Sequence, residues 1–351
     1  MLNNVFGLLP EEIELSGDSK LPVYRKQQLL TWLYKQYCAD PDKMLNLPSE
    51  LRDSLSQRYS FVLPEIQTRL KASDNAVKFG LKLEDGSIIE SVLIPEARKR
   101  TLCISSQVGC ARACSFCSTG KMKLRRNLEI HEIIGQIIVA SADLKNTEAE
   151  ATRLSNLVFM GMGEPLDNAG NVFQVLRILQ HSSTLAFSPR RTTLSTCGVV
   201  PGIIQMADSG IKAKLAVSLN SAIPTKRDQL MPINMQYPLT ELKQALLYFR
   251  RKSSFRITLE YVLIPGVNMA LEDLKALKRF VGDISCKLNF IPFNPAPASE
   301  YRAPTSEECA HFMQQAQSLP QAVTLRKSRG ADVLGACGQL RNHSKEENID
   351  E

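Results

Sequence analysis

The period of the hydrophobic and polar positions changes near residue 76. Between residues 1 and 75 the apolar residues recur mainly at helical spacing, as in 23–37 and 51–59, which predicts a small helical accessory domain. Residues 76–83 and 87–94 instead alternate around Glu84-Asp85-Gly86, a turn sequence typical of a β-hairpin. We therefore expect a helical domain over 1–75 and a hairpin extension over 76–100.

From residue 101 onward, short apolar segments alternate with segments of helical period. The expected strands are 101–105, 156–160, 192–195, 214–219, 256–263, 287–291 and 323–326, and the expected helices are 129–145, 171–180, 200–208, 239–251, 271–281 and 305–318. Strands that alternate with helices predict a parallel sheet. We expect one α/β domain over 101–340, built as a full or partial barrel or as an open doubly wound sheet. The short polar tail, 341–351, is expected to be disordered.

Composition places the chain among ordinary globular proteins. It has 351 residues, of which 44% are hydrophobic and 23% are charged. Its N-terminus carries acidic residues where a secretory signal would be basic, and no apolar run is long enough to span a membrane. These features predict a cytoplasmic protein without a membrane partner.

The positive charge is concentrated in short clusters. The net charge is +7, and the basic clusters are 98–100, 121–126, 190–191, 250–252 and 326–329. Any one cluster is compatible with a solvated loop or helix end. Because two of them flank the densest group of cysteines, and lysine and arginine bind phosphate backbones, we expect a nucleic acid partner.

Cys110, Cys114 and Cys117 form a C-x₃-C-x₂-C spacing within eight residues. Nine cysteines are an odd number for a disulfide framework, so some are expected to serve metal or redox chemistry. Three thiolates can hold three irons of a four-iron cluster and leave one iron open, for example to S-adenosylmethionine. A zinc site with Cys103 as fourth ligand is the alternative, although zinc usually takes two separated pairs. The spacing favours the cluster.

Further polar residues follow the expected strands. They are Gly161 to Pro165, Ser195 to Gly198, Ser218 to Asn220, and Asn294. In parallel α/β folds, ligands bind at the carboxyl ends of the strands. We therefore expect these residues and the cysteine triplet to share one site.

Several of these segments are motifs, and from about Glu90 to Leu340 the sequence resembles the RlmN/Cfr family of radical-SAM adenine methyltransferases, with the RlmN branch closest. The resemblance depends on Ser105 to Cys110, Cys114 to Thr119, Met160 to Pro165, Leu194 to Thr196, and Ala336 to Leu340. It implies a partial (βα)6 TIM-like barrel with a [4Fe-4S] cluster and S-adenosylmethionine as cofactors. The helical N-terminal segment fits the family's accessory domain more loosely.

The resemblance also implies a role for each matching residue. Cys110, Cys114 and Cys117 match the cluster ligands. Cys337 matches the cysteine that becomes S-methylated, Cys103 its resolving partner, and Glu90 a carboxylate that accepts a proton. The expected contacts to S-adenosylmethionine are Gly163, Glu164, Ser195, Ser218, Leu219, Asn220 and Asn294. By themselves, Cys103 would be read as core packing and Glu90 as a surface carboxylate.

The implied reaction is methylation of carbon 2 of adenine, with two molecules of S-adenosylmethionine per turnover. The implied substrates are 23S rRNA at the peptidyl transferase centre and the tRNA adenosine 3′ of the anticodon. An electron donor such as flavodoxin and a monomeric state are also expected. The alternatives are methylation at carbon 8, as in Cfr, and a non-catalytic iron–sulfur or zinc protein that binds RNA.

Two positions depart from the family pattern. Asn220 stands where histidine is common, and asparagine does not titrate near neutral pH. Cofactor binding can survive this change, whereas a proton-handling role there is in doubt. Cys197 stands where serine is usual in the family. It is either a thiol without a function that is prone to oxidation, or a change in packing without consequence.

Overall fold

The computed structural model describes residues 2–14, 23–148, 153–297 and 299–341. Its centre is a ten-stranded sheet with the order β14-β13-β12-β11-β10-β9-β6-β5-β4-β3. In chain order the strands are β3 (Glu65–Lys71), β4 (Val77–Lys82), β5 (Ile88–Glu96), β6 (Lys99–Ile104), β9 (Asn156–Phe159), β10 (Thr192–Thr196), β11 (Lys214–Ser218), β12 (Ile257–Leu263), β13 (Cys286–Pro292) and β14 (Val323–Leu325). The described strands β3 and β14 form its two edges.

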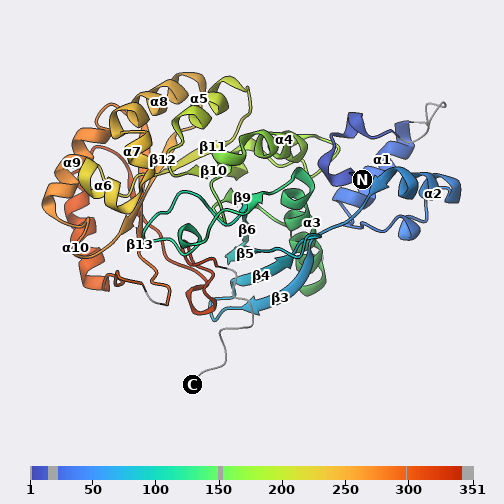
Figure 1. Cartoon of the computed structure of the whole chain (residues 1–351), viewed down its shortest axis with the longest axis horizontal. Helices are drawn as coiled ribbons and strands as arrows, with labels where there is room; N and C mark the ends of the chain where they lie inside the picture. The colour runs from blue at the N-terminus through green and yellow to red at the C-terminus, as the bar shows by residue number, and fades with distance from the viewer. Residues whose placement is uncertain (1, 15–22, 149–152, 298, 342–351) are drawn as a thin grey trace.

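The strands from β6 to β14 in this sheet are mutually parallel, and a helix follows each of the first six. These helices are α3 (Ile130–Thr147), α4 (Ala169–Gln180), α5 (Val200–Asp208), α8 (Leu239–Lys252), α9 (Leu271–Val281) and α10 (Ser306–Ala316). Figure 1 shows α5, α8, α9 and α10 along the outside of the curved sheet. The expected partial (βα)6 barrel is confirmed, and the open doubly wound sheet is not the architecture adopted.

The local sequence explains why these elements form. Helix α3 places Ile133, Ile134, Ile137 and Ile138 on its buried side, and all four are fully buried. Its first turn is capped because the Glu129 amide donates to the Glu132 carboxylate at 2.8 Å. The central strands are largely buried on both faces, which is typical of a parallel sheet covered by helices.

The hairpin prediction is confirmed, and the sheet also extends one strand further towards the N-terminus. Strands β4 and β5 pair in antiparallel register, and Gly86 takes a φ of +79° in their turn. Residues 65–71, which were expected within the helical segment 1–75, form the edge strand β3. All seven residues of β3 are exposed, and only Ile66 and Leu70 are strongly apolar, so its alternation is too short and too weak to predict a strand.

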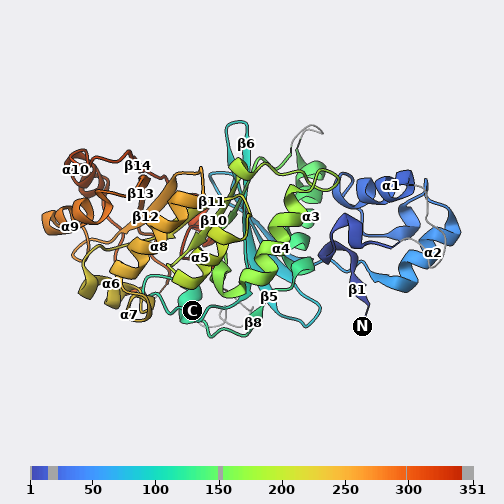
Figure 2. The ribbon, with the colours of Figure 1, turned by 90° about the horizontal axis from the view of Figure 1, so that it is seen from above.

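The N-terminal segment packs against α3, on the side of the barrel. Helices α1 (Val23–Tyr34) and α2 (Ser49–Arg58) enclose a small core in which the rings of Phe6 and Tyr34 meet edge to face at 5.9 Å. Two short parallel strands, β1 (Asn3–Asn4) and β2 (Tyr59–Ser60), close it. Figures 1 and 2 show this segment beyond α3, at the far end from α9 and α10.

Short elements around the cysteine triplet were not predicted. Strands β7 (Gln107–Val108) and β8 (Arg126–Asn127) pair on either side of the triplet. Helices α6 (Pro224–Leu230) and α7 (Ile233–Gln236) are inserted between β11 and α8. Each is too short to show a period. The tail expected to be disordered after Arg341 lies outside the described residues, and no helix within them is long and apolar enough to cross a membrane.

A substitution at Gly135 tests how closely α3 packs against Pro64, which directly precedes β3. A Cβ atom at Gly135 would overlap the Pro64 ring, whereas one at Gly170 in α4 meets nothing within 4 Å. We expect Gly135→Ala to lower the free energy of unfolding by about 1–3 kcal/mol through overpacking. Gly170→Ala is the matched control and should raise it by about 0.5–1 kcal/mol. Urea unfolding measures both, and a stabilised Gly135→Ala variant would contradict the close packing.

Candidate active site

The three cysteines of the triplet lie on one loop after β7 and border the same cavity. Cys110, Cys114 and Cys117 are free thiols of intermediate exposure, and the cavity has a volume of about 170 Å³. The loop is tightly turned: Gly109 has a φ of +82°, and a side chain there would overlap the Lys123 carbonyl. The Ser115 amide donates to the Leu230 carbonyl at 3.0 Å, which ties the loop to α6.

The donor set suits a multi-iron cluster. Burial, together with repulsion from Cys117 and nearby carboxylates, raises the pKa of Cys110 to about 11, and burial and the neighbouring thiolates also raise the pKa of Cys114. Three thiolates this close need a cationic partner to be stable in deprotonated form. No three His, Cys, Asp or Glu side chains among the described residues converge tightly enough to chelate a single metal ion. Thiolates that each bind a different iron do not need to converge in that way.

The loop after β9 forms the facing wall of the cavity. A side chain at Gly161 would press on the Ile104 backbone at 2.7 Å, and Gly163 has a φ of +93°. The buried Glu164 carboxylate accepts from the amides of Leu166 at 3.0 Å and Cys197 at 2.7 Å. Burial raises the pKa of Glu164, and these amide bonds oppose the shift. A cationic amino group in the cavity would complete the pairing of this carboxylate.

The other expected cofactor contacts divide into two groups. Ser195, Ser218 and Asn294 line the cavity together with Gly163 and Glu164. Leu219 and Asn220 are fully buried and are not among the lining residues. Their assignment as contacts therefore stays a prediction that comes from the resemblance alone.

Asn220 has a structural role in this chain. Its backbone is left-handed, with a φ of +56°, which asparagine tolerates better than most residues. Its Oδ1 accepts from the Val262 amide at 2.9 Å, and its own carbonyl accepts from Asn268 Nδ2 at 2.8 Å. These bonds fasten the end of β11 to the strand β12 and the loop after it.

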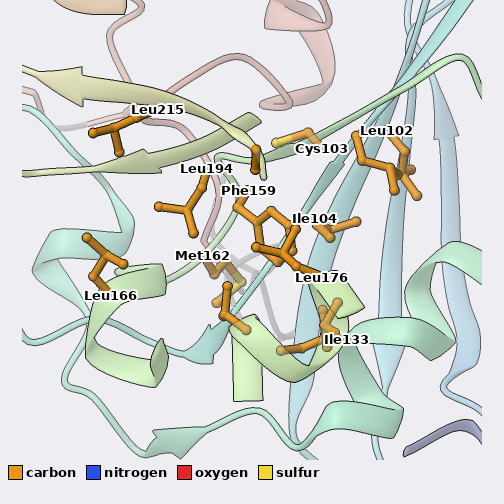
Figure 3. Close-up of a cluster of buried hydrophobic side chains, with 14 of the residues drawn as sticks. Leu102, Cys103, Ile104, Ile133, Phe159, Met162, Leu166, Leu176, Leu194 and Leu215 are labelled. Atoms are coloured by element: carbon orange, nitrogen blue, oxygen red, sulfur yellow. The ribbon is translucent and has the colours of Figure 1, made fainter. Parts of the chain in front are cut away.

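Cys103 and Cys337 border a second, small cavity of about 20 Å³. Both are free thiols. Figure 3 shows the Cys103 sulfur pointing away from Leu102 and Ile104, as alternation along β6 requires. Burial, followed by repulsion from Cys337, raises the pKa of Cys103 to about 12. Cys337 also lines the cavity of the triplet, so it stands where the two spaces meet.

The segment that follows Cys337 is held by hydrogen bonds to two loops, the cysteine loop and the loop after β13. The Ser118 amide donates to the Gly338 carbonyl at 2.7 Å, and Thr119 Oγ1 donates to the Leu340 carbonyl at 2.5 Å. Gln339 Nε2 donates to the Pro295 carbonyl at 2.9 Å. The thiol itself is half-buried. The backbone is thus held while the side chain remains open to both cavities.

Glu90 lies apart from both cavities. It is a buried residue of β5 that lines neither of them, and its carboxylate meets Lys78 Nζ at 3.1 Å in a buried ion pair. It also accepts from the Arg341 amide at 2.9 Å. Burial raises the pKa of Glu90, and Lys78 opposes this shift. In this structure Glu90 fastens the end of the Cys337 segment, and its role as proton acceptor stays a prediction.

Arg326 is a site residue that the sequence pattern did not reveal. It was grouped with residues 327–329 as an RNA-binding cluster, but it follows β14 and lines both cavities beside Cys337 and Asn294. The Cys337 thiolate raises the pKa of Arg326, and Glu260 contributes after it. Glu260 is a buried residue of β12 that lines the larger cavity and accepts from Asn289 Nδ2 at 2.7 Å. The sequence offered one signal for these two site residues, namely their positions: Arg326 lies at the end of one expected strand, and Glu260 lies within another.

Arg227 is a second missed cation, fully buried in α6. Its guanidinium donates to the carbonyls of Cys197 at 2.8 Å, Leu219 at 3.1 Å and Ser218 at 3.3 Å. These carbonyls follow β10 and end β11, so Arg227 orders two loops of the cavity. Cys197 itself is buried and lines the larger cavity, and burial and then Glu164 raise the pKa of its thiol well above the ordinary value.

Family models match the two parts of the chain separately. Residues 104–281 match the model of the radical SAM superfamily, and residues 18–60 match that of the ribosomal RNA large subunit methyltransferase N-terminal domain. The crystal structure of a radical SAM methyltransferase from Sphaerobacter thermophilus has a TM-score of 0.91 and 37% identity, and covers 97% of this chain and 99% of that one. Fold and site together therefore define a radical SAM enzyme.

Curated relatives narrow the class. The chain is 40% identical over 338 residues to the dual-specificity RNA methyltransferase RlmN of Bdellovibrio bacteriovorus, covering 96% of this chain and 83% of that protein. It is 42% identical over 343 residues to the RlmN of Geobacter sulfurreducens, covering 96% and 92%. The chain belongs to the RlmN family of radical SAM RNA methyltransferases. Membership implies a [4Fe-4S] cluster and S-adenosylmethionine, and it replaces the zinc and non-catalytic alternatives.

The two cysteines outside the triplet should differ sharply in reactivity. With a pKa of about 12, Cys103 is a thiolate in only about one molecule in 10⁵ at pH 7, whereas Cys337 is half exposed. We expect iodoacetamide to label Cys337 first in the native protein. Labelling of Cys103 should accelerate about tenfold per pH unit between pH 7 and 9. Peptide mass spectrometry measures both, with Cys38 as a half-exposed reference, and equal rates for Cys103 and Cys337 would contradict this arrangement.

Proposed function

We propose that the protein methylates carbon 2 of adenine in RNA, and that the transferred carbon passes through Cys337. The observation that supports this most directly is the position of Cys337 between two adjoining cavities. One cavity is bordered by the cysteine triplet and Glu164, and the other by Cys103. A residue that carries the transferred carbon must be able to reach both the cavity in which the radical is generated and the thiol that releases the product.

Residues of the larger cavity are suited to hold both cofactors. Cys110, Cys114 and Cys117 would bind three irons of the cluster, and Glu164 would pair with the amino group of S-adenosylmethionine. When bound, the cluster supplies the electron that cleaves S-adenosylmethionine to a 5′-deoxyadenosyl radical. The cavity has a largely apolar wall, with Phe116, Phe159 and Phe293 among its lining, which limits water around so reactive a species.

Cys337 and Cys103 divide the remaining chemistry. Cys337 first accepts a methyl group from one molecule of S-adenosylmethionine, and a second molecule provides the radical that removes a hydrogen atom from that methyl group. The resulting carbon radical then bonds to carbon 2 of adenine, which loses its proton, and the remaining unpaired electron would return to the cluster that supplied it. Cys103 attacks the Cys337 sulfur and breaks its bond to the transferred carbon, which takes up a proton to become the methyl group of the released base, and a disulfide remains between the two cysteines. Reduction of this disulfide completes the turnover.

The same proposal includes the substrates and partners. The relatives are named dual-specificity RNA methyltransferases, which supports 23S rRNA and tRNA as the two substrates. The target adenine has to leave its stack to reach the cavity. An electron donor such as flavodoxin would serve the cluster. We further propose a monomer in the cytoplasm, where these RNAs are found.

Digestion and mass spectrometry of product RNA test the position of the methyl group. The protein is reconstituted anaerobically with iron and sulfide and incubated with S-adenosylmethionine, a reductant and unmodified tRNA or 23S rRNA fragments. We expect 2-methyladenosine in both RNAs. Methylation at carbon 8 would overturn the proposed regiochemistry, and methylation of one RNA alone would overturn the dual specificity.

Two cysteine variants are the controls for the route through Cys337. Cys337→Ala should yield no methylated RNA, and its protein should take up no label from methyl-labelled S-adenosylmethionine. Cys103→Ala should acquire the label and then remain joined to the RNA through a methylene bridge, because the resolving thiol is missing. Product formation by Cys337→Ala at the wild-type rate would exclude the methyl-cysteine route.

Glu90 and Lys78 form a matched pair for testing the proton acceptor. Removing either partner of a buried ion pair costs roughly 3–5 kcal/mol of unfolding free energy, so Glu90→Gln and Lys78→Gln should both lose stability. If Glu90 takes the proton, only Glu90→Gln should stop at the protein–RNA adduct, while Lys78→Gln still releases methylated RNA. Gel electrophoresis of the adduct separates the two. Equal turnover losses in both variants would leave Glu90 a purely structural residue.

A further inference from the structure

Exposed cations gather at the amino ends of the parallel strands, opposite the cysteine triplet. Lys99 begins β6, Lys214 begins β11, and Lys287 is the second residue of β13. Arg191 directly precedes β10, and Arg256 directly precedes β12. All five are exposed. We call this surface, with its neighbours Arg98, Arg153, Arg190 and Lys212, the amino-end face.

A hollow of about 650 Å³ forms the part of this face nearest to the accessory domain. Its charged lining is entirely basic and consists of Arg98, Lys99, Arg100, Arg153 and Arg191. The hairpin between β5 and β6, which carries Arg98 and Lys99, stands out from the sheet in Figure 2. Of these five residues, only Arg100 has an ion pair among the described residues, with Glu148 at 2.7 Å.

The acidic residues near the face do not neutralise it. Glu96 lies opposite Lys99 in the β5–β6 pair, but no ion pair joins them in the described structure. Asp208 meets Lys252 at 3.6 Å, at the end of α8. The pKa of Lys214 is lowered by partial burial and by repulsion from Lys287, Lys99 and Arg190. A bound anion would relieve this repulsion and stabilise the charged form of Lys214.

The face continues onto the accessory domain. Lys35 follows α1, and partial burial and the charge of Arg153 lower its pKa. The basic residues therefore extend from the accessory domain across the start of five barrel strands. Neighbouring strands lie about 4.8 Å apart, so the strand ends alone span roughly 25 Å. This is longer than any small anion and suits a chain of phosphates.

We propose that the amino-end face binds the phosphate backbone of the RNA substrate, at the opposite end of the barrel from the catalytic cavity. This inference rests on the proposed RNA methyltransferase function. RNA fits better than an acidic protein because none of the large exposed hydrophobic residues of the described structure belongs to the face. Protein interfaces usually depend on buried aromatic and aliphatic anchors, whereas phosphate contacts need only exposed cations.

Only an RNA that is large enough to extend from the cavity to the amino-end face can make this contact. The longest barrel strands have seven residues, or about 23 Å. A folded tRNA or rRNA domain can place one segment in the cavity and pass a flanking helix along the amino-end face. A short hairpin that ends near the target adenine would contact the cavity alone. The face would therefore favour folded RNA over isolated stem-loops.

Salt-dependent binding of fluorescently labelled RNA tests this inference on the full-length chain. The test variant is Arg98→Gln/Lys99→Gln/Arg191→Gln, and the matched control is Lys275→Gln/Lys278→Gln/Arg279→Gln on α9, which removes three equally exposed cations. We expect the test variant to bind an unmodified tRNA transcript about tenfold or more weakly at 0.1 M salt. The slope of log K against log salt should fall by about 2 to 3, as for three lost phosphate contacts. The α9 variant should match the wild type.

Two further measurements separate the possible outcomes. Arg98→Lys/Arg191→Lys should keep tRNA binding close to wild type, because a phosphate contact needs a positive charge and not a guanidinium shape. An anticodon stem-loop should bind the wild type and the triple variant equally. Wild-type tRNA binding that the triple variant retains, with an unchanged slope, would overturn the amino-end face and leave the proposed function intact. A wild-type protein that neither binds nor methylates RNA would overturn both.

Discussion

Two hydrogen bonds join parts of the chain that are about 220 residues apart and determine where the proposed reaction takes place. Ser118 donates to the Gly338 carbonyl and Thr119 to the Leu340 carbonyl, so the end of the cysteine loop and the segment after Cys337 become neighbours. Backbone carbonyls are the acceptors, and the bonds therefore depend little on side-chain identity at 338 and 340. The triplet and Cys337 belong to separate loops at the barrel mouth. These two hydrogen bonds form a junction that joins the loops directly, while the bonds of Gln339 and Glu90 hold the Cys337 segment from other sides.

The junction also explains why buried charges surround the site. Bringing Cys103, Cys337 and the triplet together concentrates thiols that can ionise, and Glu164 and Glu260 add buried carboxylates. Arg326 and Arg227 are the cations placed among them, one beside Cys337 and the other behind the loops of Cys197 and Ser218. In a medium of low dielectric constant, each such cation counters charge more strongly than it would in water. The Glu90–Lys78 pair is separate and holds the far end of the Cys337 segment.

The sequence was a good guide wherever a period or a motif spans many residues. All seven parallel barrel strands and their six helices were predicted, because continuous apolar strands alternate with amphipathic segments such as α3. The cysteine triplet and the loop at Gly163 were predicted from spacing and motif. Strand β3 was missed because it buries no face, and α6 because it spans under two turns. Arg326 and Arg227 were missed because only tertiary packing distinguishes a half-buried or buried arginine from a solvated one.

The two ends of the barrel carry different kinds of residues because of the parallel architecture. Every strand begins at one end and finishes at the other, so residues at strand starts and strand ends collect on opposite faces. In this chain the cavity at the strand ends combines thiols and the carboxylates Glu164 and Glu260 with the cations Arg112 and Arg326, whereas the strand starts carry exposed lysine and arginine. The thiols and carboxylates of the cavity would repel an RNA phosphate, and cations at either end of the barrel offset that repulsion. The proposed contact at the amino ends would add attraction for a polyanion at a distance from the cavity, so that the charges around the cofactors need not change.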